Sequence, residues 1–238
     1  MARWAPLKKD QLEALAKEIL HNYGHGRAIV AIDGPTGTGT RQFADDLAAT
    51  VRTLGHEAFR ASIEDFHTPR SFRERNGRLS PSALYEDGYD YSVLQRVLLD
   101  PFRATSGTGF VLAAFDVNRD APFQSKWTTA TPDALLIIDG LFLNRKELAG
   151  FWNYSVWLEA PSEAAEEAAA EGSTDSALPG ASPAAVGESV VGEPSEEAHR
   201  DLGADALYWA EAQPRGVATA IIDNNDPEHP RRIFADSC

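Results

Sequence analysis

Closely spaced glycines and threonines fill one short stretch of the chain, Gly34 to Arg41, which reads GPTGTGTR. Glycines let successive backbone N–H groups point inward, and such a concave row of donors binds anions. Gly34 and Gly39 match the two glycines of the phosphate-loop pattern G-x-x-x-x-G-K-[ST]. Thr40, however, stands in the lysine position and Arg41 in the position of the hydroxyl that binds magnesium. The stretch therefore predicts a loop of phosphate-loop ancestry with an incomplete motif, and an ordinary tight turn is the alternative.

Acidic side chains follow three apolar runs elsewhere in the chain, as Glu64-Asp65, Asp116 and Asp139. The carboxyl ends of parallel strands form the edge of a sheet where ligands bind in α/β proteins. A carboxylate held at such an edge can act as a general base. One that follows a strand downstream of a phosphate loop is typical of a magnesium ligand. The simpler alternative is that these acids cap turns or helices at the ends of strands.

One basic cluster stands out in a chain with a net charge of −14. It lies between Pro69 and Arg78 and holds four arginines against the single acid Glu74. Arginines in such a group can bind a phosphate or another anionic substrate. A solvated loop explains the same pattern equally well.

Short apolar runs alternate with helical periods along the chain, which predicts an α/β fold with a mostly parallel, doubly wound sheet between two helical layers. The helices expected at the two ends of the fold are residues 10–20, within an N-terminal amphipathic segment 1–26, and residues 195–212. The expected strands are Ile29–Ile32, Ala58–Ile63, Phe110–Phe115, Leu135–Ile138, Tyr154–Leu158 and Ala218–Ile222.

The chain is expected to form a single domain over residues 1–238. Within it, residues 161–194 differ in composition: Ser162 to Glu171 is rich in alanine and glutamate and favours a helix. Gly172 to Glu193 is rich in Gly, Ser, Ala and Pro and is typical of a low-complexity loop.

Composition excludes several classes of protein. The negative net charge argues against nucleic acid or an anionic membrane as a partner. The single cysteine, Cys238, allows neither a disulfide framework nor a cysteine metal site. Met1 to Asp10 has no apolar core of a signal peptide, and no apolar run is long enough to span a membrane. We therefore expect a soluble, cytoplasmic protein, whose oligomeric state the sequence leaves open.

Taken together, five segments resemble the uridine kinase family of phosphate-loop (P-loop) kinases, most closely its actinobacterial-type members. The segments are AIDGPTGTGT, RASIEDFHTPR, YEDGYDYSVL, the pair Phe115-Asp116 and LLIIDGLFL. The resemblance covers about Ile29 to Leu158 and returns at Ile221 to Asn224. It implies a three-layer P-loop NTPase fold with a five-stranded parallel core. It also implies transfer of the ATP γ-phosphate, with Mg²⁺, to the 5′-hydroxyl of a nucleoside.

The resemblance also assigns roles to individual residues. Glu64, with Asp65 beside it, matches the catalytic-base carboxylate, and Asp139 matches the acid that holds Mg²⁺. The nucleotide phosphates would contact Gly34, Pro35, Thr36, Gly37, Thr38, Gly39, Thr40 and Arg41. The acceptor, a nucleoside or other small molecule, would contact His67, Arg70, Asp87 and Asp116.

Three departures from the family separate the functional hypotheses. The loop lysine and hydroxyl are replaced, the histidine expected after the third strand is absent with Asn118 nearest, and the expected arginine-rich lid is the acidic segment Ser162 to Glu171. Phosphoryl transfer depends on positioning and on neutralising charge, so these losses weaken its main catalytic term. The open hypotheses are a kinase with a rewired site, a non-catalytic nucleotide-binding protein, and an interaction protein that keeps only the fold.

Overall fold

The computed structural model describes residues 7–104, 107–124, 126–159 and 195–234. The acidic segment 161–194 and Cys238, on which the sequence made predictions, lie outside the described residues.

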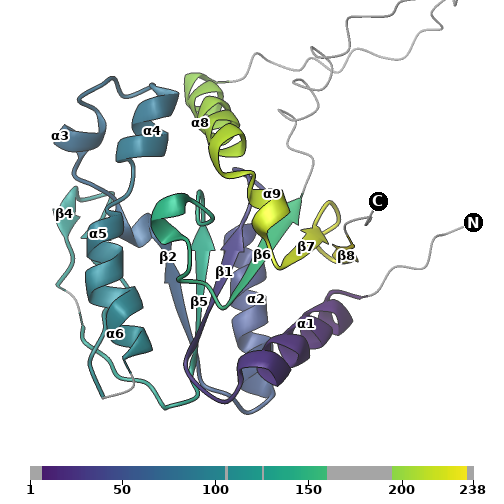
Figure 1. The fold of residues 1–238 in the computed structure, drawn as a ribbon. Helices are drawn as coiled ribbons and strands as arrows, with labels where there is room; N and C mark the ends of the chain where they lie inside the picture. The colour runs from purple at the N-terminus through teal and green to yellow at the C-terminus, as the bar shows by residue number, and fades with distance from the viewer. Residues whose placement is uncertain (1–6, 105–106, 125, 160–194, 235–238) are drawn as a thin grey trace, which may run out of the picture.

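A six-stranded sheet forms the centre of the molecule, with the strand order β2-β5-β1-β6-β7-β8 (Figure 1). The first five strands of this order are parallel, and only β8 runs antiparallel, beside β7. This confirms the predicted α/β fold with a mostly parallel sheet. The strands are β1 (Ala28–Asp33), β2 (Ala58–Ser62), β5 (Leu135–Gly140), β6 (Tyr154–Glu159), β7 (Ala220–Asp223) and β8 (Arg231–Ile233).

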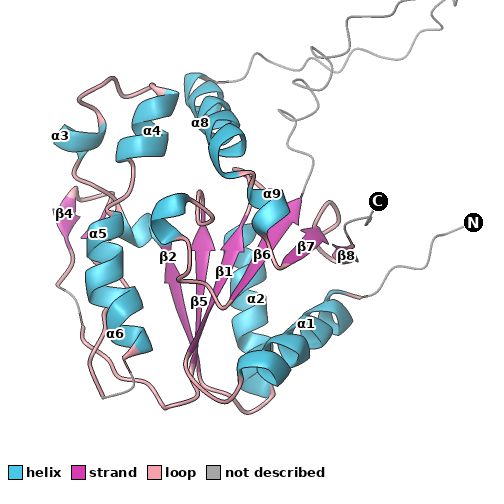
Figure 2. Cartoon of the chain, in the orientation of Figure 1, coloured by secondary structure: helices cyan, strands magenta, loops and turns pink. Residues whose placement is uncertain are grey.

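Helices cover both faces of the sheet, which gives three layers (Figure 2). On one face, apolar side chains of α1 (Lys8–Tyr23) and α2 (Thr40–Thr53) pack against β1, β5 and β6. On the other, the core includes residues of α5 (Tyr91–Leu94), the π-helical turn η2 (Gln95–Leu99), α6 (Asp100–Arg103) and α8 (Glu196–Ala212). Every residue of β1 and β5 is buried, because each of these strands has helices on both sides.

Two helices meet above the carboxyl ends of the strands, α4 (Pro81–Asp87) and α8 (Figure 1). Ser80 caps α4 by accepting from the Ala83 amide, and Ser195 caps α8 by accepting from the Ala198 amide. The helices approach closely at Gly203, where an added Cβ would lie 2.6 Å from a ring carbon of Pro81. A short helix, α3 (Arg70–Arg73), precedes α4, and α9 (Pro214–Val217) follows α8.

The predicted third strand, Phe110–Phe115, is wrong. Only Phe115–Asp116 (β3) is a strand, and it pairs antiparallel with β4 (Ala121–Pro122) outside the main sheet. Phe110 is apolar and buried for another reason: its ring packs edge-on against Phe59 and Phe102, at 5.2 Å between ring centroids in each pair. Burial by a loop thus produced the apolar pattern of a strand. The sequence also missed β8, which has only three residues, two of them arginines.

Two short 3-10 turns complete the description, η1 (Ile63–Phe66) after β2 and η3 (Lys146–Leu148) before β6. None of the helices in the described part of the chain has the length and apolar character needed to cross a membrane.

Candidate functional site

The glycine-rich loop runs from the end of β1 to the first residue of α2, as the sequence predicts. Gly37 and Gly39 have φ values of 86° and 82°, a left-handed conformation that glycine adopts without strain. The Thr38 hydroxyl donates to the Pro35 carbonyl at 2.8 Å, and the Asn224 side chain donates to the Thr38 carbonyl at 2.9 Å. These two hydrogen bonds therefore fix the conformation of the loop around Thr38. The first amides of α2 have no partner within the helix and can bind an anion.

Two cavities border this loop. The first, of about 410 Å³, is lined by Thr36 of the loop and by Glu64, and we call it the Glu64 cleft. The second, of about 400 Å³, is lined by Gly37 and Gly39 together with Asn224 and Asn225 after β7. A ligand whose phosphates lie on the loop would thus be next to both cavities.

Glu64 is the best-held acid of the Glu64 cleft. It lies in η1, and its Oε1 accepts from the Tyr89 hydroxyl at 2.6 Å while its Oε2 is 2.9 Å from Nε2 of His67. Nδ1 of His67 is 2.9 Å from the Gly88 carbonyl oxygen, and the imidazole stacks on the Tyr89 ring at 4.7 Å. Both ring nitrogens of His67 thus lie within hydrogen-bond distance of oxygen acceptors, and these contacts fix the orientation of the ring.

Opposing effects set the protonation of Glu64. Burial raises the pKa of its carboxyl, but the hydrogen bond and charge of His67, the Tyr89 hydroxyl and the charge of Arg41 together lower that pKa below its ordinary value. Glu64 is therefore an ionised, oriented carboxylate at neutral pH. Asp65 beside it differs: burial raises its pKa, Arg41 lowers it, and the charges of Asp139 and Glu64 raise it.

Asp139, the penultimate residue of β5, is in the position of the expected magnesium ligand, but arginine and serine side chains pair with its carboxylate. Its Oδ1 accepts from Arg60 at 2.6 Å and its Oδ2 accepts from Ser62 at 3.2 Å. The Arg60 guanidinium also contacts Asp45 at 2.9 Å. The Asp139 side chain is buried, at 2% exposed. Both of its carboxylate oxygens have hydrogen-bond partners inside the protein.

Arg41 is a second arginine near the partners of Asp139. Its Nη2 lies 3.5 Å from the Ser62 hydroxyl, on the same side of the loop as Asp139. A guanidinium only donates hydrogen bonds, whereas Mg²⁺ needs oxygen ligands. Within the residues that the structure describes, no group of three or more His, Cys, Asp or Glu side chains could hold a metal ion. The residues present at this position therefore do not fit magnesium.

Three other predicted site residues have partners away from the Glu64 cleft. Asp87 pairs with Arg75 at 3.1 Å, and Asp116 accepts from the amides of two residues that follow it. The Arg70 amide donates to Asp120 at 2.7 Å. Of the four residues predicted to contact an acceptor, His67 lines the cleft, and the other three are not among the residues that line it.

Helix α8 supplies site residues that the sequence did not predict. Arg200 and Asp201 line the Glu64 cleft, and the Asp205 carboxylate accepts from the Thr36 amide of the loop at 3.2 Å. Burial raises the pKa of Asp205 to about 6, although the Thr36 hydrogen bonds oppose the shift. The sequence predicted this helix from its apolar face, but periodicity carries no signal that the helix lies against the loop.

A second buried carboxylate contacts the loop at its first residue. Asp33, the last residue of β1, accepts from the Tyr208 hydroxyl of α8 and from the amide and side chain of Asn144, at 3.1 and 2.7 Å. Burial raises its pKa to about 7, against these hydrogen bonds. Asp33 also accepts from the Gly34 amide at 3.0 Å, so it links α8 to the first residue of the loop.

Comparison with solved structures places this arrangement in a known fold. A possible uridine kinase from Bacillus stearothermophilus superposes with a TM-score of 0.67 and 20% sequence identity, over 90% of this chain and 97% of the other. D-glycerate 3-kinase from Cryptococcus neoformans superposes with a TM-score of 0.58 and 9% identity, over 96% and 100% of the two chains. The chain has the P-loop kinase fold. No family model and no curated protein matches its sequence.

The P-loop kinase fold explains why one edge of the sheet holds all of these groups. The P-loop follows β1, Glu64 follows β2 and Asp139 lies one residue before the end of β5. These three parallel strands are adjacent, in the order β2-β5-β1. Their carboxyl ends therefore meet at one place. At these identities the likeness defines the fold, and the chemistry depends on this chain's own side chains.

Proposed function

We propose that this chain is a uridine kinase-like phosphotransferase of low turnover. It would bind ATP at the P-loop and transfer the γ-phosphoryl group to a hydroxyl of a nucleoside or small metabolite in the Glu64 cleft. One observation carries the proposal: Glu64 is fixed by Tyr89 and His67 in a cleft that Thr36 of the P-loop also lines. A cytoplasmic location, where ATP is available, belongs to the same proposal.

In this reaction Glu64 orients the acceptor hydroxyl and takes its proton. A bond forms between the hydroxyl oxygen and the γ-phosphorus, the bond from that phosphorus to the β,γ-bridging oxygen breaks, and ADP leaves. A carboxylate with a lowered pKa is a weak base, but the transition state of phosphoryl transfer is loose and requires positioning more than basicity. His67 stabilises the ionised form of Glu64 before the transfer.

Low turnover follows from the charges near the P-loop. Thr40 provides no cation where the complete motif has lysine, and Arg41 provides one at the next position. Charge that is misplaced relative to the transferring group lowers the rate, because electrostatic stabilisation depends on donors aimed at the developing charge. Since the residues around Asp139 do not fit magnesium, the proposal includes no step through a metal.

A second candidate, a non-catalytic nucleotide-binding protein, is favoured by the contact between Asp205 and the P-loop. A carboxylate on the Thr36 amide takes a position that an anionic ligand would use, and it repels a phosphate. Binding alone would then be the function, and Glu64 would hold the acceptor without reaction.

The two candidates separate in a transfer assay with γ-labelled ATP, with uridine, cytidine and D-glycerate as acceptors. We expect labelled product that accumulates linearly with enzyme concentration, at a turnover below the usual enzymatic range of about 1–10³ per second. ATP binding measured by calorimetry without product would support the binding protein instead. Absence of both binding and product would reject the two candidates together.

A further inference from the structure

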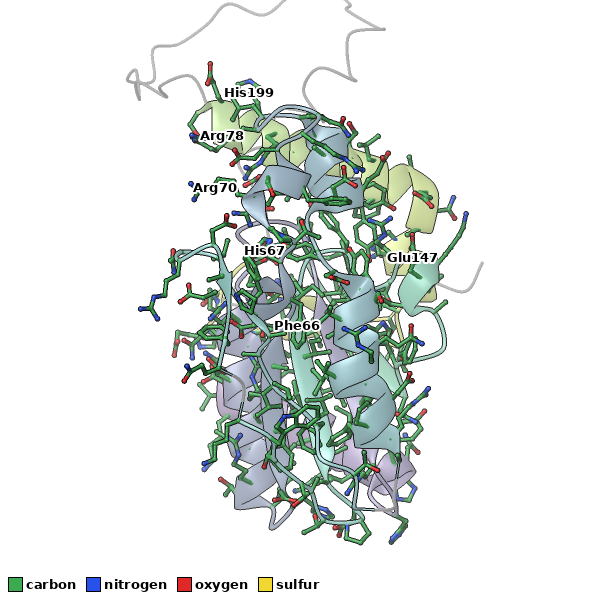
Figure 3. All side chains as sticks on the ribbon, turned by 90° about the vertical axis from the view of Figure 1, so that its left-hand side faces the viewer. Phe66, His67, Arg70, Arg78, Glu147 and His199 are labelled. Atoms are coloured by element: carbon green, nitrogen blue, oxygen red, sulfur yellow. The ribbon has the colours of Figure 1, made fainter. Side chains whose placement is uncertain are left out.

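Three arginines from three different segments line the Glu64 cleft: Arg73 of α3, Arg78 of the loop after it, and Arg200 of α8. Figure 3 shows Arg78 above His67, at the level of α8. Glu64 and Thr36 belong to the strand edge below. The cleft thus has basic side chains toward its helical end and the ionised carboxylate with the P-loop toward its sheet end.

These arginines retain hydrogen-bonding capacity. Among the described residues, no partner forms an ion pair or hydrogen bond with the side chain of Arg73, whose backbone amide donates to the Pro69 carbonyl at 3.1 Å. Arg78 pairs with Glu197 at 2.5 Å, but both side chains are more than half exposed, and such surface pairs exchange readily. Arg200 gives its Nε and Nη2 to the neighbouring Asp201, and no described residue accepts from its Nη1.

Two arginines outside the cleft, Arg60 and Arg145, are fully engaged by comparison. Arg60 contacts two carboxylates, and Arg145 pairs with Glu147, donates to the Tyr85 carbonyl and stacks 4.0 Å from the Tyr85 ring. Both of these arginines have structural partners on several sides. The cleft arginines differ from these two because they combine donors without a structural partner with a position in the wall of a cavity.

We propose that the acceptor bound in the Glu64 cleft is itself an anion, a small hydroxy acid or a sugar phosphate. Its carboxylate or phosphate would pair with Arg73 and Arg200, and its hydroxyl would lie at Glu64. This rests on the proposed function and narrows its substrate class. The volume of about 410 Å³ suits a small metabolite, and Leu84, Val117 and Leu141 form the apolar part of the wall.

Acidic residues in the same cleft do not cancel this basic end. Glu74 lies 3.8 Å from Arg70, and Asp201 is engaged by Arg200. Glu64 is held by His67 and Tyr89 at the sheet end. An anion at the helical end would therefore meet donors from Arg73 and Arg200, and planar guanidinium groups bind carboxylate and phosphate through two parallel hydrogen bonds.

Paired ligands that differ only in the anionic group test this inference. Calorimetry compares D-glycerate with glycerol and ribose 5-phosphate with ribose, and uridine serves as the neutral nucleoside. We expect each anion to bind at least about tenfold more tightly than its neutral counterpart, since a charge-assisted pair is worth that much. Arg73→Gln and Arg200→Gln should each remove most of this preference. Arg96→Gln, an exposed arginine of η2 outside the cleft, should leave it unchanged.

Three results would overturn the inference: equal affinity for the anionic and neutral members of each pair, tighter binding of uridine than of either anion, or an anion preference that survives in both cleft variants. Thermal unfolding of each variant shows whether it is folded, and Arg73 is the safer position because no described residue depends on it. A parallel ATP titration keeps the two proposals apart. ATP binding without anion preference rejects only this inference, whereas anion preference without ATP binding rejects the proposed kinase.

Discussion

Two groups of residues near the P-loop, those around Glu64 and those around Asp139, differ in which features of the proposed kinase site they contain. At the proposed acceptor site, Glu64 is held by His67 and Tyr89, lines a cleft and is ionised. At the proposed phosphate site, Asp139 is paired with Arg60 and Ser62, and Thr40 and Arg41 depart from the P-loop motif. Both groups lie at the same edge of the sheet. The fold alone therefore does not determine the chemistry of either group.

The contrast has a simple structural reason. The partners of Glu64 are His67, three residues after it, and Tyr89, two residues after the end of α4, so they come from local segments and not from a neighbouring strand of the main sheet. The partners of Asp139 come from β2, where the strand register places Ser62 opposite Asp139 and Arg60 two residues earlier on the same side. An arginine in that register neutralises the carboxylate and leaves the sheet unchanged.

The largest effect on phosphoryl transfer is expected from a substitution of Glu64. Glu64→Gln keeps the shape of the side chain but removes the charge and the proton acceptor. Phosphoryl transfer should fall by at least about 10²-fold, the usual contribution of a general base, while ATP affinity changes little. A steady-state assay with labelled ATP measures this. Glu86→Gln, an exposed acid of α4, is the matched control, and an equal loss in that variant would contradict the assignment.

The second-largest effect is expected on ATP affinity, from changes to the altered P-loop motif. Thr40→Lys combined with Arg41→Thr restores the lysine and hydroxyl of the phosphate-loop pattern, so ATP affinity should rise about tenfold through one added charge-assisted contact. Turnover should stay below about one per second, because Arg60 still holds Asp139. The two single variants show whether the gains add. Turnover in the normal enzymatic range would mean that only the motif had been lost.

A smaller effect is expected from Asp205→Asn, which removes a negative charge from the Thr36 amide. ATP affinity should rise a few-fold at pH 7.5, because the ionised carboxylate competes with phosphate. Its pKa is raised to about 6, so below that pH the wild-type side chain is largely protonated and the difference should disappear. Calorimetry at pH 7.5 and pH 5.5 measures both. An advantage that persists unchanged at pH 5.5 would exclude the electrostatic explanation.

The raised pKa of Asp205 also makes the free energy of unfolding depend on pH. A raised folded-state pKa means that the folded protein binds its proton more tightly than the unfolded chain does. The free energy of unfolding should therefore fall as pH rises from about 4 to about 6, through the interval between the two pKa values. Asp205→Asn should reduce that slope in urea titrations, and an unchanged slope would contradict the raised pKa.

The sequence predicted the parts of the fold that depend on local pattern. β1 and β5 are continuous apolar runs, and both were found with bounds close to those expected. Phe110–Phe115 misled the prediction, because a loop buried among aromatic rings shows the same composition as a strand. Periodicity measures burial and not hydrogen bonding, so it cannot separate these cases.

The site was less predictable than the fold for a related reason. Glu64 and His67 are three residues apart in one turn, and sequence reasoning could assign both to the site. Asp205 and Thr36 are far apart in sequence, and their contact depends on how α8 packs against the sheet. Tertiary packing of this kind leaves no local signal, so the role of α8 emerged only from the structure.

The central claim is that the residues around Asp139 do not fit Mg²⁺, because Arg60 and Ser62 already pair with its carboxylate. Titration of ATP with and without magnesium tests this claim most directly. Free ATP carries more negative charge than its magnesium complex and should suit Arg41 better. The account predicts that ATP binds at least as tightly in EDTA as in excess Mg²⁺. An increase in affinity of about tenfold or more on adding Mg²⁺, equivalent to about 1.4 kcal/mol, would contradict it.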